Sequence, residues 1–183
     1  VKLLAAFSGC RVASHHLVGT TGYGYDDAGR AKIEEVFARI CGAEASLFRH
    51  SFASGTHALA VVLFGLLRPG DVMLCATGRP YDPRAGGCGR GENAGHGSVA
   101  GCGVQYRQID MAGDGLDLAA IAQNAPGAAM LYLQRSRGDA LRRALSLADI
   151  EAAAKAAKAA NPGIVVVVDN CYGTFEQRHE PTQ

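Results

Sequence analysis

Hydrophobic and polar positions along the chain follow two different periods, one typical of helices and one typical of strands. The helical period predicts helices over residues 30–41, 57–67, 117–124 and 146–160. Short apolar or β-branched runs predict strands over residues 46–50, 71–76, 104–109, 129–134 and 164–169. Helices that alternate with strands are typical of a mostly parallel sheet covered on both faces. We therefore predict an α/β protein with three layers, α/β/α.

Three of these segments carry a more specific expectation. The helix at residues 57–67 is apolar on nearly all sides, so it should be buried. The run at residues 164–168 is continuously β-branched, which favours a central parallel strand buried on both faces. Ser146 with Asp149 three residues later is a helix-start signature, with Asp in place of the usual Glu.

Two regions break the alternation. Residues 8–29 are polar and contain glycines, which predicts an arm or loop, so we place an N-terminal arm at residues 1–29 and a larger domain at residues 30–183. Residues 84–103 are dense in glycine and predict a flexible surface loop.

Charge and cysteine content narrow the function classes. The formal net charge is +1, from 18 basic and 17 acidic residues that are interspersed, which argues against nucleic acid and anionic membranes as partners. No segment approaches the roughly 20 apolar residues of a membrane-spanning helix. Six cysteines without a CxxC pair are typical of reduced thiols, so we expect a cytoplasmic protein. The absence of an initiating Met leads us to expect a fragment.

Residues 54–57, Ser-Gly-Thr-His, follow a predicted strand and begin the apolar helix. Backbone N–H groups and the positive end of a helix dipole can bind a phosphate there, and the hydroxyls of Ser54 and Thr56 add donors beside Gly55. The same residues also suit a simple N-cap of a core helix. Both interpretations remain open from the sequence.

Asp169 ends the valine-rich strand, where a carboxylate faces the crevice in which parallel sheets bind ligands. The alternative is a turn-forming Asp-Asn pair. Tyr81 follows the strand at 71–76 and can stack on a flat ligand or simply pack. Arg135 and Arg137 end the strand at 129–134 and are expected to point at the crevice, for anion capture or for exposure to solvent.

His15 and His16 are candidates for metal ligands or a catalytic base, although adjacent histidines in a polar arm are more often solvated. No second carboxylate and no His is spaced to complete a metal site with Asp169, so we expect no metal.

Several of these segments together resemble one known family. The segments are TTGYGYDD (residues 20–27), SGTHA (54–58), LRPGD (67–71), QRSRG (134–138) and VDNCYG (168–173). They are similar to the bacterial methionine gamma-lyase family, also called aluminium resistance proteins, within the aspartate-aminotransferase-like fold. The resemblance spans about residue 18 to the end of the chain and implies the cofactor pyridoxal 5'-phosphate.

The resemblance also implies a role for individual residues. Ser54, Gly55 and Thr56 match the phosphate-binding turn, and Tyr81 matches the aromatic that stacks on the pyridine ring. Asp169 matches the carboxylate that pairs with the ring nitrogen. Tyr23 and Tyr25 match an arm that reaches the cofactor phosphate of a neighbouring subunit, which implies a homodimer or homotetramer.

One departure limits this expectation. The family's Schiff-base lysine follows the aspartate strand, whereas Lys2, Lys32, Lys155 and Lys158 all precede Asp169. We therefore expect a carbon–sulfur lyase for a sulfur amino acid whose catalytic lysine and C-terminal domain lie outside this chain, which should be inactive alone. The alternatives are a remnant or binding module without chemistry, and another pyridoxal-phosphate reaction such as an aminotransferase or aldolase.

Overall fold

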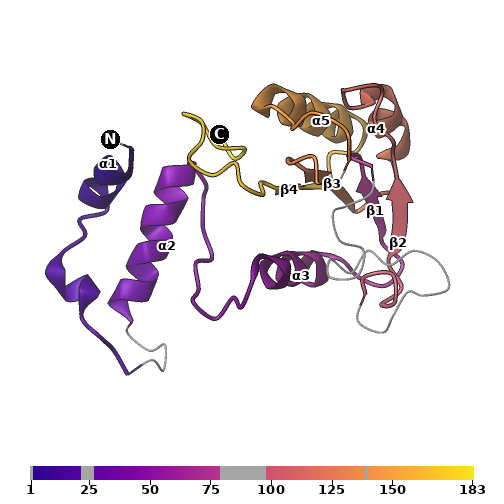
Figure 1. The fold of residues 1–183 in the computed structure, drawn as a ribbon. Helices are drawn as coiled ribbons and strands as arrows, with labels where there is room; N and C mark the ends of the chain where they lie inside the picture. Colours follow the sequence, from indigo (N-terminus) through magenta and orange to yellow (C-terminus); the bar gives the residue numbers. More distant parts are fainter. Residues whose placement is uncertain (1, 22–26, 79–97, 139) are drawn as a thin grey trace. The chain divides into compact units, whose positions relative to one another are not determined.

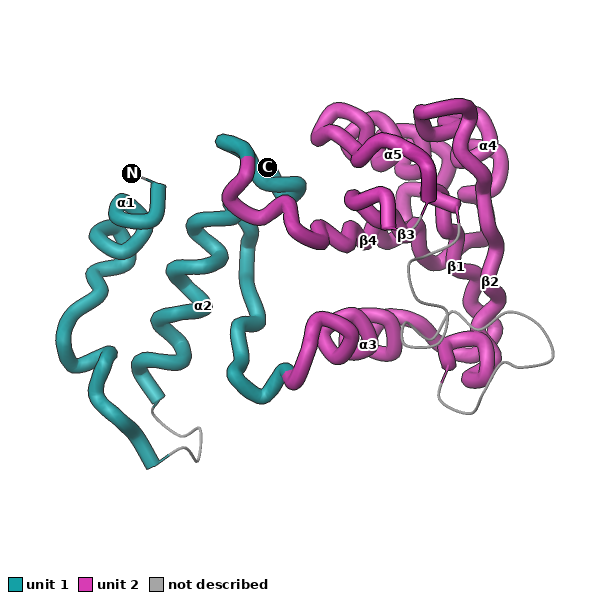
Figure 2. Tube along the Cα trace, viewed as in Figure 1, with its two compact units in different colours: residues 1–52, 177–183 teal, residues 53–176 magenta. Residues whose placement is uncertain are grey.

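The computed structural model describes residues 2–21, 27–78, 98–138 and 140–183. The chain divides into two compact units, residues 53–176 and residues 1–52 with 177–183 (Figure 2). Each unit has its own hydrophobic core. None of the helices in the described ranges is long and apolar enough to cross a membrane.

Residues 53–176 contain a four-stranded sheet in the order β2-β1-β3-β4, and every pair of neighbouring strands is parallel (Figure 1). The strands are β1 (Val72–Cys75), β2 (Gln105–Gln108), β3 (Met130–Gln134) and β4 (Val165–Asp169). Four of the five predicted strands are thereby confirmed, with ends that differ by one residue.

Helices cover both faces of this sheet. Helices α4 (Leu118–Asn124) and α5 (Leu147–Ala160) pack on the face formed by Leu74, Leu131 and Leu133. Helix α3 (Gly55–Leu66) packs on the opposite face, against Met73, Cys75, Met130 and Tyr132. The two faces are opposite because successive strand residues point to opposite sides of a sheet. The predicted three-layer α/β/α arrangement is confirmed.

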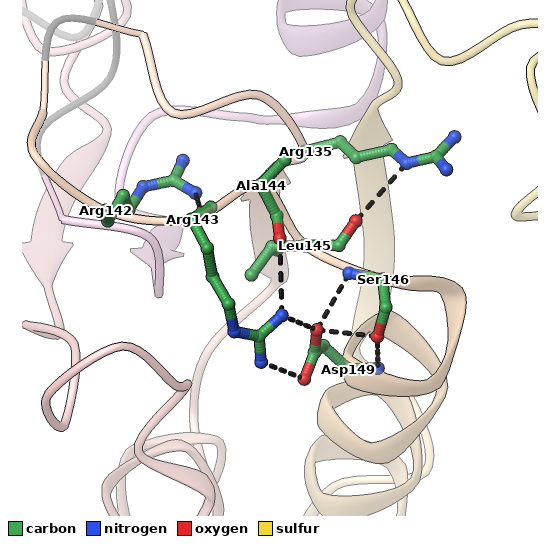
Figure 3. A network of polar contacts seen from close by, with 7 residues as sticks. All are labelled: Arg135, Arg142, Arg143, Ala144, Leu145, Ser146 and Asp149. Carbon is green, nitrogen blue, oxygen red and sulfur yellow. Dashed lines mark hydrogen bonds and ion pairs between the residues drawn. The ribbon is translucent and has the colours of Figure 1, made fainter.

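Polar side chains at the first turn fix where α5 begins. The Ser146 hydroxyl accepts a hydrogen bond from the Asp149 N–H, and the Asp149 carboxylate accepts one from the Ser146 N–H at 2.7 Å. This reciprocal pair satisfies N–H groups that otherwise lack a partner at a helix start. The Arg143 guanidinium joins it through an ion pair with Asp149 (Figure 3). The predicted helix-start signature is confirmed.

The expectation that the apolar helix is buried on all sides is wrong for most of α3. Leu63 is its one buried residue, and four large side chains are between 38% and 47% exposed, namely Val61, Val62, Phe64 and Leu66. Only one side of a helix meets a sheet, and the described part of residues 53–176 includes no further layer over the outer side of α3. An all-apolar composition therefore predicts the helix but not its environment.

The position of the valine-rich strand was also predicted wrongly. Within the described sheet β4 is an edge strand that pairs with β3 alone, and Val165 is 39% exposed. The central, fully buried strand is β3. A β-branched run indicates a preference for extended backbone, but it does not indicate how many neighbouring strands the segment will pair with.

Most of the glycine-dense stretch 84–103 lies outside the described residues. Its last part, residues 98–103, forms turns, and here Ser98 and Val99 are buried rather than at the surface. Val99 belongs to the core on the α3 side of the sheet. The prediction of a surface loop is therefore wrong for these two residues, because an apolar side chain flanked by glycines can still reach the core.

The second unit is built from α1 (Lys2–Gly9), the short 3-10 helix η1 (Ser14–Leu17) and α2 (Ala28–Cys41). Its core is small and consists of Ala6, Cys10, Val36 and Ile40. Residues 177–183 pack in the same unit, where the Thr182 hydroxyl donates to the Cys41 carbonyl. Neither α1 nor η1 was among the predicted helices.

The predicted strand at residues 46–50 is not a strand. This segment forms hydrogen bonds with α2 and does not pair with a strand of the sheet. The Ser46 hydroxyl donates to the Glu34 carbonyl at 2.7 Å, and the Phe48 N–H donates to the Glu34 carboxylate at 2.9 Å. The ring of Phe48 also packs against Phe37 with centroids 5.1 Å apart. The Glu34 carboxylate of α2 thus pairs with the Phe48 N–H, a backbone group that a neighbouring strand would otherwise satisfy.

Candidate functional site

A cavity of about 780 Å³ opens where β3 and β4 end and where α3 begins. All of its lining residues belong to residues 53–176. Carboxyl ends of parallel strands and the N-terminus of a helix are the usual place for ligands in open α/β sheets. The lining comprises Gly55, Ala58, Leu59, Val62, Gln134, Ser136, Arg137, Gly138, Val168, Asp169, Asn170, Cys171 and Tyr172.

Asp169 is the acidic residue of this lining, and both of its carboxylate oxygens are held. Oδ1 accepts a hydrogen bond from the Cys171 N–H at 3.0 Å. Oδ2 accepts one from the Tyr132 hydroxyl at 3.2 Å. Each oxygen can accept a further hydrogen bond, because a carboxylate offers about four lone-pair positions. The half-buried carboxylate is therefore oriented before any ligand arrives.

The turn-forming interpretation of Asp169 is confirmed, because a tight turn follows β4. Cys171 adopts a left-handed conformation with φ of 51°, and the Gly173 N–H donates to the Asn170 carbonyl at 2.8 Å. A side chain in the left-handed region is uncommon and needs surrounding contacts to hold it there. The turn and the candidate binding role thus belong to the same residues.

At the start of α3, the N-cap interpretation is confirmed. The Ser54 hydroxyl accepts a hydrogen bond from the His57 N–H at 3.1 Å. Gly55 lines the cavity, and a Cβ added there would meet no atom within 4 Å. Ser54 and Thr56 are exposed and flank the cavity without lining it. An anion at this helix start would meet backbone N–H groups and the positive end of the helix dipole.

The two arginines of the segment after β3 have different environments. Arg137 is exposed and lines the cavity, as predicted for one of them. The prediction fails for Arg135, whose side chain is only 6% exposed and does not line the cavity. Its guanidinium instead donates hydrogen bonds to the Leu145 and Gly173 carbonyls and to the Asn170 side-chain oxygen.

Cys171 lines the cavity beside Asp169, and burial raises the pKa of its thiol. The thiol also donates to the Asp169 carbonyl at 3.4 Å. A thiol with a raised pKa is less often in the nucleophilic thiolate form. The backbone N–H of Cys171 is the group that contacts the Asp169 carboxylate in the site.

Sequence reasoning missed Tyr132, Gln134 and Cys171. Tyr132 lies two residues before the end of β3, and the register of β3 with β4 places Gln134 opposite Asp169. Strand alternation puts residues 132 and 134 on the same face of the sheet. A correct assignment of β3 and β4 as neighbours would have found both residues, but the sequence does not state which strands pair.

Other predicted site residues lie elsewhere. Tyr23, Tyr25 and Tyr81 lie outside the described residues. His15 and His16 are in the unit that contains α1, and the His16 ring accepts a hydrogen bond from the Ala13 N–H at 2.9 Å. That bond gives His16 a local role at the start of η1.

Within residues 53–176 the arrangement supplies three features to one cavity. Asp169 supplies a fixed carboxylate, the start of α3 supplies backbone N–H groups, and Leu59, Val62 and Val168 supply apolar walls. Such a set suits a flat, cationic ring that carries an anionic tail.

Comparison with known proteins supports the family resemblance over the whole chain. The sequence profile of the family described as methionine gamma-lyase matches residues 1–183. YnbB of Bacillus subtilis, whose description gives no function, is 40% identical over 185 residues, which cover 98% of this chain and 43% of YnbB.

Solved structures of two relatives are similar to this chain in sequence and in backbone structure. A Clostridium acetobutylicum protein, described as a proposed cystathionine beta-lyase involved in aluminium resistance, is 35% identical with a TM-score of 0.93. A Clostridium novyi protein, described as a carbon-sulfur lyase involved in aluminium resistance, is 38% identical with a TM-score of 0.91. Each similarity covers 99% of this chain and 44% of the other chain, so this chain spans less than half the length of these relatives.

The resemblance inferred from five short segments is therefore confirmed along the full chain, in sequence and in backbone structure. The chain belongs to the methionine gamma-lyase family.

Proposed function

We propose that this chain is the cofactor-binding part of a pyridoxal-phosphate-dependent carbon–sulfur lyase that acts on a sulfur amino acid. The observation that carries the proposal is the Asp169 carboxylate, held by two donors inside a cavity at the end of β4. The family resemblance implies pyridoxal phosphate as the cofactor, and the two Clostridium relatives are named as lyases.

The residues of the cavity fit pyridoxal phosphate by their chemistry. Asp169 would hold the ring nitrogen, while the N–H groups of Gly55 and Thr56, with the Ser54 turn, would hold the phosphate. Tyr81 would stack on the ring, as the family resemblance implies. When bound, pyridoxal phosphate takes up the electrons released as bonds to the substrate's α carbon break.

The chain's own residues would bind and orient. The Asp169 carboxylate keeps a proton on the ring nitrogen, because an ionised acid stabilises the protonated form of a neighbouring base. The Tyr132 hydroxyl and the Cys171 N–H keep that carboxylate in place. Leu59, Val62 and Val168 exclude water from the ring, which strengthens each polar contact inside the cavity.

None of the four lysines, all of which lie in the described residues, lines the cavity. Lys155 and Lys158 lie on α5, where their ammonium groups bind the Glu151 carboxylate and the Pro162 carbonyl. Neither lines the cavity, and Lys2 and Lys32 belong to the unit that contains α1. We propose that the lysine comes from a part of the relatives' length that this chain does not span, so this chain alone binds the cofactor without lyase activity.

The remaining proposals follow from the family. We propose that residues 30–183 belong to the cofactor-binding large domain and residues 1–29 to an arm. Tyr23 and Tyr25 of this arm would reach the cofactor phosphate of a neighbouring subunit, which makes the complete enzyme a homodimer or homotetramer.

An analogue without the aldehyde separates cofactor binding from covalent attachment. The chain is titrated with 4'-deoxypyridoxine 5'-phosphate by isothermal calorimetry, and unphosphorylated 4'-deoxypyridoxine serves as the control. We expect binding of the phosphorylated compound and at least about tenfold weaker binding of the control, because charged hydrogen bonds to the phosphate are lost. Equal or absent binding of the two compounds would refute a cofactor site in this cavity.

The lyase proposal needs a second experiment on the full-length product of the gene. After incubation with pyridoxal phosphate and reduction with borohydride, mass spectrometry should find the cofactor on a lysine that follows Asp169. Thiol release from sulfur amino acids is then measured with a colorimetric thiol reagent. A labelled lysine without thiol release would favour another pyridoxal-phosphate reaction. If no lysine is labelled, the protein shares the family's fold but does not attach the cofactor, and the lyase proposal is refuted.

A further inference from the structure

Arg135 is a buried cation next to the candidate site but outside its lining. It is the first residue after β3, and its side chain is 6% exposed. A buried guanidinium is costly unless its N–H groups find acceptors. The acceptors that it uses therefore indicate what this residue holds together.

The Arg135 guanidinium binds three oxygens from two segments. Its Nη1 donates to the Asn170 side-chain oxygen at 2.7 Å and to the Gly173 carbonyl at 3.2 Å. Its Nε donates to the Leu145 carbonyl at 3.4 Å (Figure 3). The backbone adds one more link, because the Arg135 N–H donates to the Asp169 carbonyl at 2.9 Å.

Two of these acceptors are the ends of the turn that follows β4. Between Asn170 and Gly173 lies Cys171, which adopts the left-handed conformation and whose N–H donates to Asp169 Oδ1. The arginine thus fixes both ends of the turn whose middle holds the carboxylate. A free turn would lose this unusual conformation, because left-handed backbone is unfavourable for a residue with a Cβ.

The close approach of Gly173 to the arginine supports the same conclusion. A Cβ added at residue 173 would overlap Arg135 Nη1 and come within 2.8 Å of the Asn170 side-chain oxygen. Gly173 is buried and its φ is not in the left-handed region, so space for the guanidinium is the reason for glycine here.

We propose that Arg135 is a positioning residue for Asp169: it clamps the turn at residues 170–173 so that the Cys171 N–H orients the carboxylate toward the cofactor's ring nitrogen. This inference rests on the proposed function, because it assumes that Asp169 binds such a ring. Arg135 itself touches neither cofactor nor substrate.

The test compares two ligands that differ only at the ring nitrogen. These are 4'-deoxypyridoxine 5'-phosphate and its 1-deaza analogue, in which carbon replaces the nitrogen, and each is titrated into the chain by calorimetry. The ratio of the two dissociation constants reports the contact with Asp169. A general loss of structure would weaken both ligands and leave this ratio unchanged.

We expect the unsubstituted chain to prefer the nitrogen-containing ligand, and Arg135→Gln to reduce this preference on the order of tenfold. Affinity for the deaza analogue should stay the same. Gly173→Ala should have the same effect, because it displaces the guanidinium without removing it, and it replaces Arg135→Gln if that variant does not fold. Arg143→Gln, which removes an exposed guanidinium paired with Asp149, is the matched control and should keep the preference.

A measurement without ligand accompanies the titrations. Hydrogen exchange of the Cys171 amide, followed by NMR, should become faster in both Arg135→Gln and Gly173→Ala. If the unsubstituted chain prefers the nitrogen ligand and both variants retain the full preference, the role of Arg135 is overturned while the cofactor site stands. If the unsubstituted chain shows no preference, the proposed pairing of Asp169 fails first, and the role of Arg135 fails with it.

Discussion

The two faces of the sheet in residues 53–176 are covered to different degrees. On the face toward α4 and α5, the side chains of Ile121, Leu131 and Ala153 are 0% exposed. On the face toward α3, Leu63 is buried while Val62 and the other large outer side chains of this helix remain partly exposed.

The candidate cavity belongs to the less covered side. Gly55, Leu59 and Val62 of α3 line it, whereas no residue of α4 or α5 does. The larger of the two core clusters therefore lies on the α4 and α5 face, and the other face presents chemical groups to the cavity. The predictions below test this division.

The largest effect is expected from a core substitution on the α4 and α5 face. Leu131→Ala removes a fully buried side chain and should lower the free energy of unfolding by about 2–5 kcal/mol. The matched control is Leu66→Ala, at a side chain that is 47% exposed on α3, and it should cost less than about 1 kcal/mol. Urea unfolding followed by circular dichroism measures both, and equal losses would remove the contrast between the faces.

A substitution at the site should affect binding more than folding. Asp169→Asn keeps the size of the side chain but removes its charge, so affinity for 4'-deoxypyridoxine 5'-phosphate should fall about tenfold to a hundredfold. Affinity for the 1-deaza analogue should be unchanged, as calorimetry can show. If both ligands weakened equally, Asp169 would have a structural role and the ring-nitrogen contact would be excluded.

Loss of a helix cap should have a smaller effect, and again one that differs between the faces. Ser146→Ala removes the cap of α5 and should cost about 0.5–2 kcal/mol in unfolding free energy. Ser54→Ala removes the equivalent cap of α3, whose first turn is exposed and can fray without disturbing the core. Its cost in global unfolding should therefore be smaller, and a larger cost than that of Ser146→Ala would contradict the comparison.

The smallest effect concerns pH dependence on the α5 side. The Arg143 side chain, helped by the Ser146 N–H and hydroxyl, holds the pKa of Asp149 well below its ordinary value of 3.8. Because the folded-state pKa is the lower one, this carboxylate adds stability above the ordinary value and loses it as pH falls below that value. The gain is modest, since Arg143 is about half exposed.

Unfolding measured from about pH 6 to about pH 3 checks this sign, because the window spans the ordinary pKa of an aspartate. Other carboxylates also have lowered pKa values, among them Glu34 and Asp27, so the difference between the unsubstituted chain and Asp149→Asn is the informative quantity. That difference should shrink as pH falls. A difference that grew toward acid pH would show that Asp149 stabilises the fold by another route.

Local patterns in the sequence predicted most of the elements. Four helices and four strands lie where the periods of hydrophobic residues placed them, and the capping pair Ser146 and Asp149 forms as expected. These features depend on residues close together in the chain, so their physics is visible in the sequence. Asp169 was found for the same reason, because a carboxylate at a strand end is a local signal.

Apart from the unpredicted helices α1 and η1, the errors concern partners outside the segment itself. Residues 46–50 have strand-like composition but pair with Glu34 of α2, and the valine-rich strand has a neighbour on one side only. Arg135 was expected at the crevice, yet its acceptors lie up to 38 positions away, at Asn170 and Gly173.

The sequence by itself determined the class of fold, the family, the order of helices and strands, and the candidate roles of Gly55 and Asp169. Each of these depends on short segments, whose local preferences do not require knowledge of their partners in the fold. Only the tertiary structure decided which face of the sheet is closed, that Tyr132 and the Cys171 N–H hold Asp169, and that Arg135 supports the turn behind it. These contacts depend on which strands become neighbours, and that choice is made by the packing of the whole sheet rather than by any single segment.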